Sequence, residues 1–177
     1  VALGARLGLR TCDAAGLQFT AAKVASDRHL GPVGKAAAVA RDWSRLAGAA
    51  VALGIARSAL QGGVRYTLER SQFGKKIARF QPLQWQTADA AVELETARLL
   101  TWRAAWLADQ GKGFSRAAAM AALRATVACE AITDRALQMH GGYGYTVDFA
   151  AERCYRDAHA LRLLCGSLEF NRIAVAT

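Results

Sequence analysis

Residues 81–104 read QPLQWQTADAAVELETARLLTWRA, and apolar or small side chains recur along them every three or four residues. An α-helix returns to the same face about every 3.6 residues, so this spacing predicts an amphipathic helix. Phe80, Gln81 and Pro82 begin it, with the proline where a missing backbone amide costs nothing. The stripe consists of Leu83, Thr87, Ala90, Leu94, Ala97, Thr101 and Ala104. Its small residues favour close packing against another helix.

A second helical stripe lies upstream, in residues 35–69. Its members are Leu46, Ala50, Leu53 and Leu60. Gly62 and Gly63 follow on the same stretch, and two adjacent glycines predict a local weak point in the helix. Two long helices joined by a short connection predict antiparallel neighbours.

Helix-favouring sequence continues downstream of residue 104. Gly111-Lys112-Gly113 predicts the end of the second helix, and Ser115 is a candidate N-cap for a third helix over 118–137. After the glycine-rich stretch 141–144, we expect a shorter helix over 149–163 and another from Ser167. The predicted fold is therefore mainly α, an up-down helical bundle.

The first part of the chain has a different pattern. Residues 1–33 contain short alternating apolar segments interrupted by glycines, which is typical of the last strands of a β-rich unit. Gly31-Pro32-Val33-Gly34 separates this part from the helices, so we place a domain boundary between residues 33 and 34. The sequence begins at Val1 without a signal-peptide pattern, and we expect it to be truncated at this end.

Composition narrows the function classes. The net charge is +9 and the pI about 10.0, but basic and acidic residues alternate without a basic stripe, which argues against nucleic-acid binding. No run approaches the roughly 20 apolar residues of a membrane span. The cysteines, Cys12, Cys129, Cys154 and Cys165, show no C-x-x-C spacing, which argues against a metal site or a disulfide framework. We expect a cytoplasmic protein.

Four short segments are distinctive together. They are Leu9-Arg10-Thr11, Glu69-Arg70-Ser71-Gln72-Phe73-Gly74-Lys75 continuing to Phe80-Gln81, Gln138-Met139-His140-Gly141-Gly142-Tyr143-Gly144-Tyr145, and Arg156-Asp157-Ala158. In this order, and with the final stretch 166–172, they resemble the C-terminal half of the acyl-CoA dehydrogenase family. The resemblance implies that residues 1–33 end a middle β-domain and that 34–177 form the C-terminal helical domain.

The family resemblance also implies a cofactor, a substrate and partners. These are FAD, an acyl-CoA, and a homo- or hetero-tetramer with the flavin site at a subunit interface. An electron-transfer protein as acceptor is a further implied partner.

The residues that the resemblance assigns to FAD also have ordinary structural interpretations. Arg70 at a helix end can offer a planar fork to a phosphate, or can simply interact with the helix dipole. Gly141 and Gly142 can expose backbone amides to a ligand, or can serve only as a helix C-cap. Ser167 is a candidate N-cap in either case. The full set assigned by resemblance is Arg70, Ser71, Gln72, Phe73, Phe80, Gln81, Gln138, Met139, His140, Gly141, Gly142, Ser167 and Glu169.

The resemblance places Asp42, Arg45 and Gly166 near the acyl-CoA, although Asp42 and Arg45 could equally be a solvated ion pair. The family's reaction needs a base for the α-proton, and many members use a glutamate where this chain has Cys165. The other known base position holds Ser44. A thiol with an ordinary pKa near 8.5 is a poor base at neutral pH, so the catalytic residue is unknown.

Three hypotheses remain open from the sequence. The chain can belong to an active flavin oxidoreductase whose base is Asp42 or lies upstream. It can instead be a catalytically silent subunit that binds the flavin of an active partner, which agrees best with the lost base positions. The third is a helical interaction module without flavin.

Overall fold

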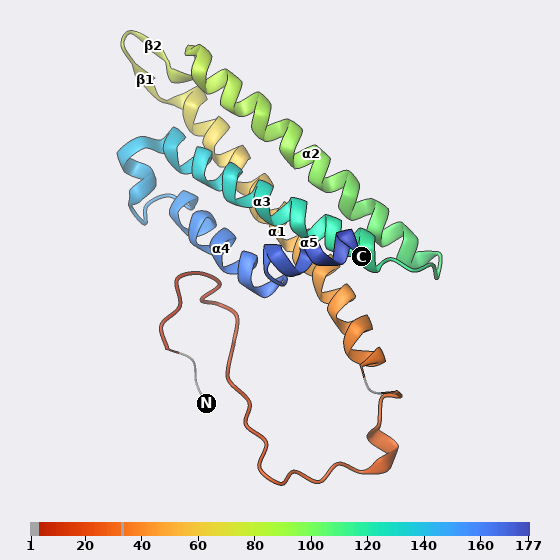
Figure 1. Cartoon of the computed structure of the whole chain (residues 1–177). Coiled ribbons are helices and arrows are strands. Elements are labelled where there is room, and N and C mark those ends of the chain that lie inside the picture. The colour runs from red at the N-terminus through yellow and green to blue at the C-terminus, as the bar shows by residue number, and fades with distance from the viewer. Residues whose placement is uncertain (1–3, 33) are drawn as a thin grey trace.

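The computed structural model describes residues 4–32 and 34–177, and its regular structure is almost entirely helical (Figure 1). Val33 and residues 1–3, which belong to the predicted boundary and N-terminal unit, lie outside the described residues. The helices are α1 (Lys35–Glu69), α2 (Gln81–Asp109), α3 (Ser115–His140), α4 (Ala151–Leu164) and α5 (Leu168–Ala176). A two-stranded hairpin, β1 (Ser71–Gln72) and β2 (Lys75–Lys76), joins α1 to α2. Short 3-10 turns are η1 (Ser26–Arg28), η2 (Ile77–Arg79) and η3 (Gly141–Tyr145). The predicted helical bundle is confirmed.

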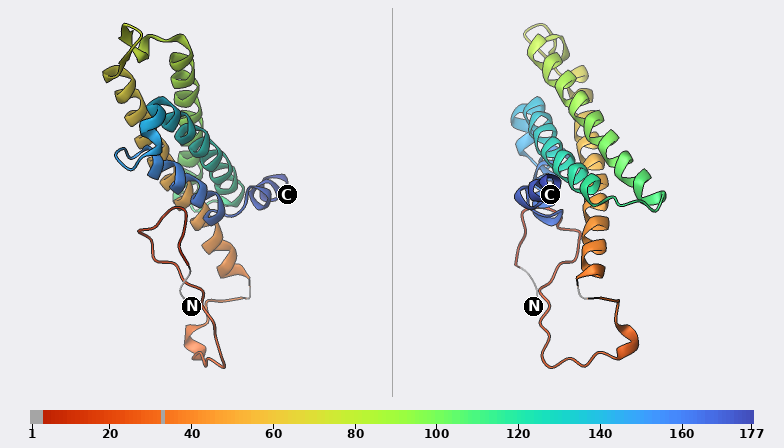
Figure 2. Two further views of the ribbon diagram at one scale, coloured as in Figure 1. Left: turned by 90° about the vertical axis from the view of Figure 1, so that its left-hand side faces the viewer. Right: turned by 45° about the vertical axis from the view of Figure 1, so that its right-hand side comes forward.

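Helix α3 lies at the centre of the bundle and packs against α1, α2, α4 and α5 (Figure 2). Its buried face is built largely from alanine, including Ala118, Ala121 and Ala125, each at most 1% exposed. Small side chains let the helix axes approach closely, and dispersion contacts between backbones then replace those of larger side chains. The core is thus a set of close helix contacts rather than a cluster of bulky residues.

The predicted weak point in α1 does not interrupt the helix. Residues 35–69 form one continuous helix through Gly62 and Gly63. Gly63 is buried, and a β-carbon there would lie 2.9 Å from Sδ of Met139 on α3. The absence of a side chain therefore serves the α1–α3 packing.

The predicted cap at Ser115 is wrong. Phe114 is the N-cap residue of α3, and no side chain in the part of the chain that the structure describes caps that end. Ser115 is the first residue of the helix, and its hydroxyl donates a hydrogen bond to Oδ2 of Asp42 on α1. The local sequence predicts that the Ser115 hydroxyl bonds to the backbone of its own helix, but in the folded chain it bonds to Asp42.

The N-terminal segment is held to α4. The amide of Leu9 donates to Oδ1 of Asp157 at 2.6 Å, and the Arg156 guanidinium donates to the carbonyl of Leu7 at 2.7 Å. Figure 1 shows the rest of residues 4–32 running as a long loop outside the bundle. The β-structure of residues 4–32 is limited to a single bridge position, Ala15. Its assignment to the end of a β-domain stays a prediction.

No helix among the described residues is long and apolar enough to cross a membrane.

Candidate functional site

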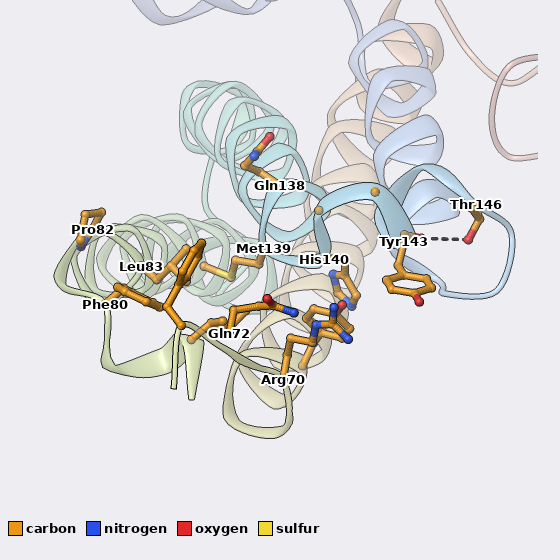
Figure 3. A pocket seen from close by; sticks show the side chains of 15 residues that line it. Arg70, Gln72, Phe80, Pro82, Leu83, Gln138, Met139, His140, Tyr143 and Thr146 are labelled. Carbon is orange, nitrogen blue, oxygen red and sulfur yellow. Dashed lines mark hydrogen bonds between the residues drawn. The ribbon is translucent and has the colours of Figure 1, made fainter. Parts of the chain in front are cut away.

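An open cavity of about 750 Å³ lies at one end of the bundle (Figure 3). Because α1, α2 and α3 alternate in direction, the end of α1, the start of α2 and the end of α3 meet there. The cavity brings together most residues assigned above to a cofactor: Arg70, Gln72, Phe73, Phe80, Gln138, Met139, His140, Gly141 and Gly142. Ser71 and Gln81 neighbour it without lining it, whereas Ser167 and Glu169 lie at the start of α5.

The hairpin between α1 and α2 presents an exposed aromatic ring. Phe73 and Gly74 both have positive φ, 53° and 77°, as the tight turn between the paired strands requires. Positive φ is uncommon for a bulky residue, so the turn holds Phe73 in an unfavourable conformation. The residue is 89% exposed, and among the described residues its ring pairs with one other aromatic ring, that of Phe80, in a T-shaped arrangement at 6.2 Å between centroids. Much of the ring therefore remains available to another molecule.

Arg70 offers an uncommitted guanidinium to the cavity. Its backbone ends α1, with the amide donating to the carbonyl of Tyr66 at 2.9 Å. The guanidinium carbon lies 5.8 Å from the centre of the Tyr143 ring, and among the described residues it pairs with no carboxylate (Figure 3). A guanidinium held over an aromatic face keeps its N–H groups free for an anion.

An aromatic cluster supports the floor of the cavity. His140 is buried, and the centroid of its ring lies 4.6 Å from that of Tyr66 and 5.2 Å from that of Phe149. Its Nδ1 is 2.7 Å from the carbonyl of Ala136; a carbonyl only accepts, so Nδ1 carries the proton. Tyr66, Tyr143 and Phe149 were not among the sequence predictions, although Tyr143 belongs to the glycine-rich motif.

The chain reverses at Gly141 with open backbone beside it. Gly141 ends α3 with φ 59° and ψ −138°, a conformation that suits glycine. A β-carbon on either Gly141 or Gly142 would meet no atom of the described residues within 4 Å. A ligand can therefore approach this backbone closely.

Asp42 and Arg45 form a buried network away from this cavity, and both are about 95% buried. Nη1 of Arg45 lies 3.2 Å from Oδ1 of Asp42, and Oδ2 of Asp42 accepts the Ser115 hydroxyl. The solvated ion pair considered from sequence is therefore wrong. Nε of Arg45 is buried and has no hydrogen-bond partner in residues 4–32 and 34–177. Ser44, which directly precedes Arg45 on α1, is exposed.

Cys165 is buried at the end of α4. Its sulfur lies against Gly48 of α1, where a β-carbon on Gly48 would overlap it. Burial raises the pKa of the Cys165 thiol to about 11, which keeps it protonated at neutral pH. Asn171 fixes the turn that follows by donating from Nδ2 to the carbonyls of Cys165 and Gly166, at 3.3 and 3.1 Å.

The start of α5 agrees with the local prediction. Oγ of Ser167 accepts the amide of Phe170 at 3.3 Å, which confirms the predicted N-cap. Hydrogen bonds from the backbone amide of Glu169 and from Ser167 lower the pKa of the exposed Glu169 carboxyl. Gly166 precedes the cap with φ 79°. This helix start thus has an ordinary capping role whatever else it contacts.

Comparison with known proteins assigns the chain to a class. The family defined by the acyl-CoA dehydrogenase C-terminal domain matches residues 34–177. The chain belongs to the acyl-CoA dehydrogenase family.

Individual relatives are similar over nearly the whole chain. The short-chain specific acyl-CoA dehydrogenase of Bos taurus mitochondria is 44% identical over 97% of this chain. CarC, a subunit of the caffeyl-CoA reductase-Etf complex of Acetobacterium woodii, is 36% identical over 97%. The structure of butyryl-CoA dehydrogenase from Megasphaera elsdenii superimposes with a TM-score of 0.93 over 98% of the chain, at 34% identity. This chain covers 42%, 46% and 46% of those proteins, respectively.

Proposed function

We propose that this chain is the helical domain of an FAD-dependent acyl-CoA oxidoreductase and that its open cavity binds the flavin nucleotide. A dinucleotide needs cations or amides for its pyrophosphate and flat surfaces for its rings. The cavity supplies the free guanidinium of Arg70, the open backbone at Gly141 and Gly142, and the exposed ring of Phe73. The residues present therefore fit the group.

The openness of this cavity supports a site shared between subunits. The Phe73 ring projects from the hairpin with little contact to its own chain. A cofactor bound by a second subunit, in a homo- or hetero-tetramer, would cover it. When bound, FAD accepts the hydride that leaves the β-carbon of an acyl-CoA.

The acyl-CoA is the proposed substrate, and Arg45 with Gly166 is proposed to lie beside it. The Asp42 carboxylate holds Nη1 of Arg45, and Nε has no partner among the described residues, so the guanidinium retains an unused donor. A donor of this kind suits the carbonyl oxygen of a thioester.

We further propose that this chain supplies no general base and acts as a silent subunit beside an active partner. The buried Cys165 thiol against Gly48, with its raised pKa, carries this proposal. Asp42 does not replace it, because Oδ1 binds Arg45 and Oδ2 binds Ser115. The relative CarC is a subunit of a caffeyl-CoA reductase-Etf complex, and this supports an electron-transferring flavoprotein as a further partner.

The test is to purify the natural gene product alone and together with the products of neighbouring genes, and to follow flavin absorbance on adding butyryl-CoA and longer acyl-CoAs. Bleaching only in the presence of a partner subunit supports the proposal. Bleaching with the gene product alone contradicts the silent-subunit role, and absence of flavin from every combination contradicts flavin binding.

Flavin binding is tested separately by the substitution Arg70→Gln. We expect flavin affinity to fall about 10- to 100-fold, because a charge-assisted hydrogen bond is lost. Arg79→Gln is the matched control, since Arg79 is exposed on the neighbouring turn η2 and does not line the cavity. Equal loss in both variants would contradict a specific role for Arg70.

A further inference from the structure

A second groove lies between α2, α3 and α5, away from the residues of the flavin cavity. Its volume is about 360 Å³, at the lower end of the roughly 300–1,000 Å³ of small-molecule sites. The floor is aliphatic, formed by Leu100, Met120, Leu123, Val127 and Val175, all half-buried. An unbranched, polarizable methionine in such a floor adapts to chains of different shape. The floor therefore suits a flexible hydrocarbon chain.

Two arginines flank this aliphatic floor. Arg124 on α3 is half-buried, and among the described residues it has neither a hydrogen bond nor an ion pair. Arg172 on α5 has one carboxylate neighbour, Oε1 of Glu169 at 3.4 Å, and both side chains are more than 60% exposed. An exposed pair of this kind contributes about 0–1 kcal/mol and is easily exchanged for another anion. Both guanidiniums are thus available to a ligand.

Arg172 has Glu169 beside it, but among the described residues no carboxylate pairs with Arg124 on the α3 side of the groove. Residues 111–129 contain Lys112, Arg116 and Arg124 but no acidic residue. A half-buried guanidinium without an anion beside it is electrostatically costly, and an arriving carboxylate would offset that cost. A small hydrophilic anion would leave the aliphatic floor uncovered, and a neutral chain would leave Arg124 unpaired.

We propose that this groove binds an amphipathic monoanion, a carboxylate on an aliphatic chain, with the carboxylate between Arg124 and Arg172 and the chain over Met120 and Val127. The site does not depend on the flavin cavity, which is formed by the opposite end of α3. Decanoate is a suitable probe, because it combines both features. Decanol lacks the charge and acetate lacks the chain.

Methyl NMR can locate the ligand within the natural gene product. Within residues 1–177, Met120 lies in the groove and Met139 in the flavin cavity, so their methyl signals, once assigned, report the two places separately. Met120→Leu and Met139→Leu each remove one signal and so assign the two methyl groups. We expect decanoate to shift the Met120 signal saturably and leave the Met139 signal unchanged, with decanol and acetate binding about tenfold more weakly or worse.

Substitutions test the arginine directly. Arg124→Gln should weaken decanoate binding about tenfold, whereas Arg116→Gln, an exposed arginine on the same helix, should not change it. Val175→Phe, which fills the groove from α5, should abolish the Met120 shift. This second variant tests the same groove if Arg124→Gln does not fold. A shift of Met139 alone, no shift at all, or a Met120 signal that follows protein concentration instead of ligand would overturn the proposal. The last result would mean that a second copy covers the groove.

Discussion

The sulfur of Cys165 occupies the space that a β-carbon on Gly48 would need. The two residues come from α1 and from the end of α4, so this contact fixes how closely these helices approach. It also directs the thiol into the core. The position at which the family resemblance implies a catalytic carboxylate therefore has a packing role in this chain.

We expect Gly48→Ala to lower the free energy of unfolding by about 1–3 kcal/mol, because the new methyl group overlaps the sulfur. Adding Cys165→Ala should recover part of this loss, since it removes the overlapping atom. A double-mutant cycle measured by urea denaturation quantifies the coupling. Gly54→Ala is the control: Gly54 is exposed on α1 with no atom near, and alanine should stabilise by up to about 1 kcal/mol. Strict additivity at positions 48 and 165 would contradict the contact.

Buried thiols should make stability depend on alkaline pH. Burial raises the pKa of Cys165 to about 11 and that of Cys129 to about 12, above the ordinary value of an exposed thiol. Their contribution is complete below pH 9 and is lost as pH rises towards 11 and 12, because only the unfolded chain releases these protons there.

The measurement is the free energy of unfolding from urea titrations between pH 8 and pH 11. We expect a steeper decline for the unmodified chain than for Cys165→Ala. Cys12→Ala is the control, because Cys12 is exposed. A Cys165→Ala chain that loses stability as steeply as the parent would show that this thiol does not titrate as a buried group.

The network of Asp42, Arg45 and Ser115 should be more sensitive to loss of the carboxylate than to loss of the hydroxyl. Asp42→Ala leaves a buried guanidinium unpaired and should cost about 3–5 kcal/mol. Ser115→Ala removes one hydrogen bond to a charged group and should cost about 1–3 kcal/mol. Ser58→Ala, at an exposed position of α1, should change stability by less than about 0.5 kcal/mol. Thermal denaturation ranks the stability losses of the three variants. A larger loss for Ser115→Ala than for Asp42→Ala would contradict the prediction.

Features that depend on neighbouring residues were predictable from the sequence. The stripe from Leu83 to Ala104 predicted the second helix because its period is a local property. Ser167 was correctly predicted as an N-cap because its partner, the amide of Phe170, is three residues away. The cavity could not be predicted from periodicity alone, because periodicity does not show that Arg70 and Gln138 line the same cavity. Only the family motifs linked these two residues.

Features that depend on distant residues were missed. Serine is a common N-cap residue, but the Ser115 hydroxyl donates its hydrogen bond to Asp42, which lies 73 positions earlier in the chain. Gly48 gave no sequence signal, since its closeness to Cys165 exists only after α1 and α4 pack. In each case the partner is set by tertiary packing, which local propensity does not describe.

The contact between Leu9 and Asp157 joins two of the family motifs and predicts how the N-terminal segment is held. Asp157→Ala removes the acceptor of the Leu9 amide, so hydrogen exchange at that amide should accelerate. Asp157→Asn keeps an oxygen at that position and should retain part of the protection. Asp27→Asn is the control, because Asp27 lies in the exposed turn η1. Gly8→Ala should release the same segment by another route, since its β-carbon would overlap the carbonyl of Arg156. Unchanged exchange at Leu9 in both Asp157→Ala and Gly8→Ala would mean that other contacts hold the segment.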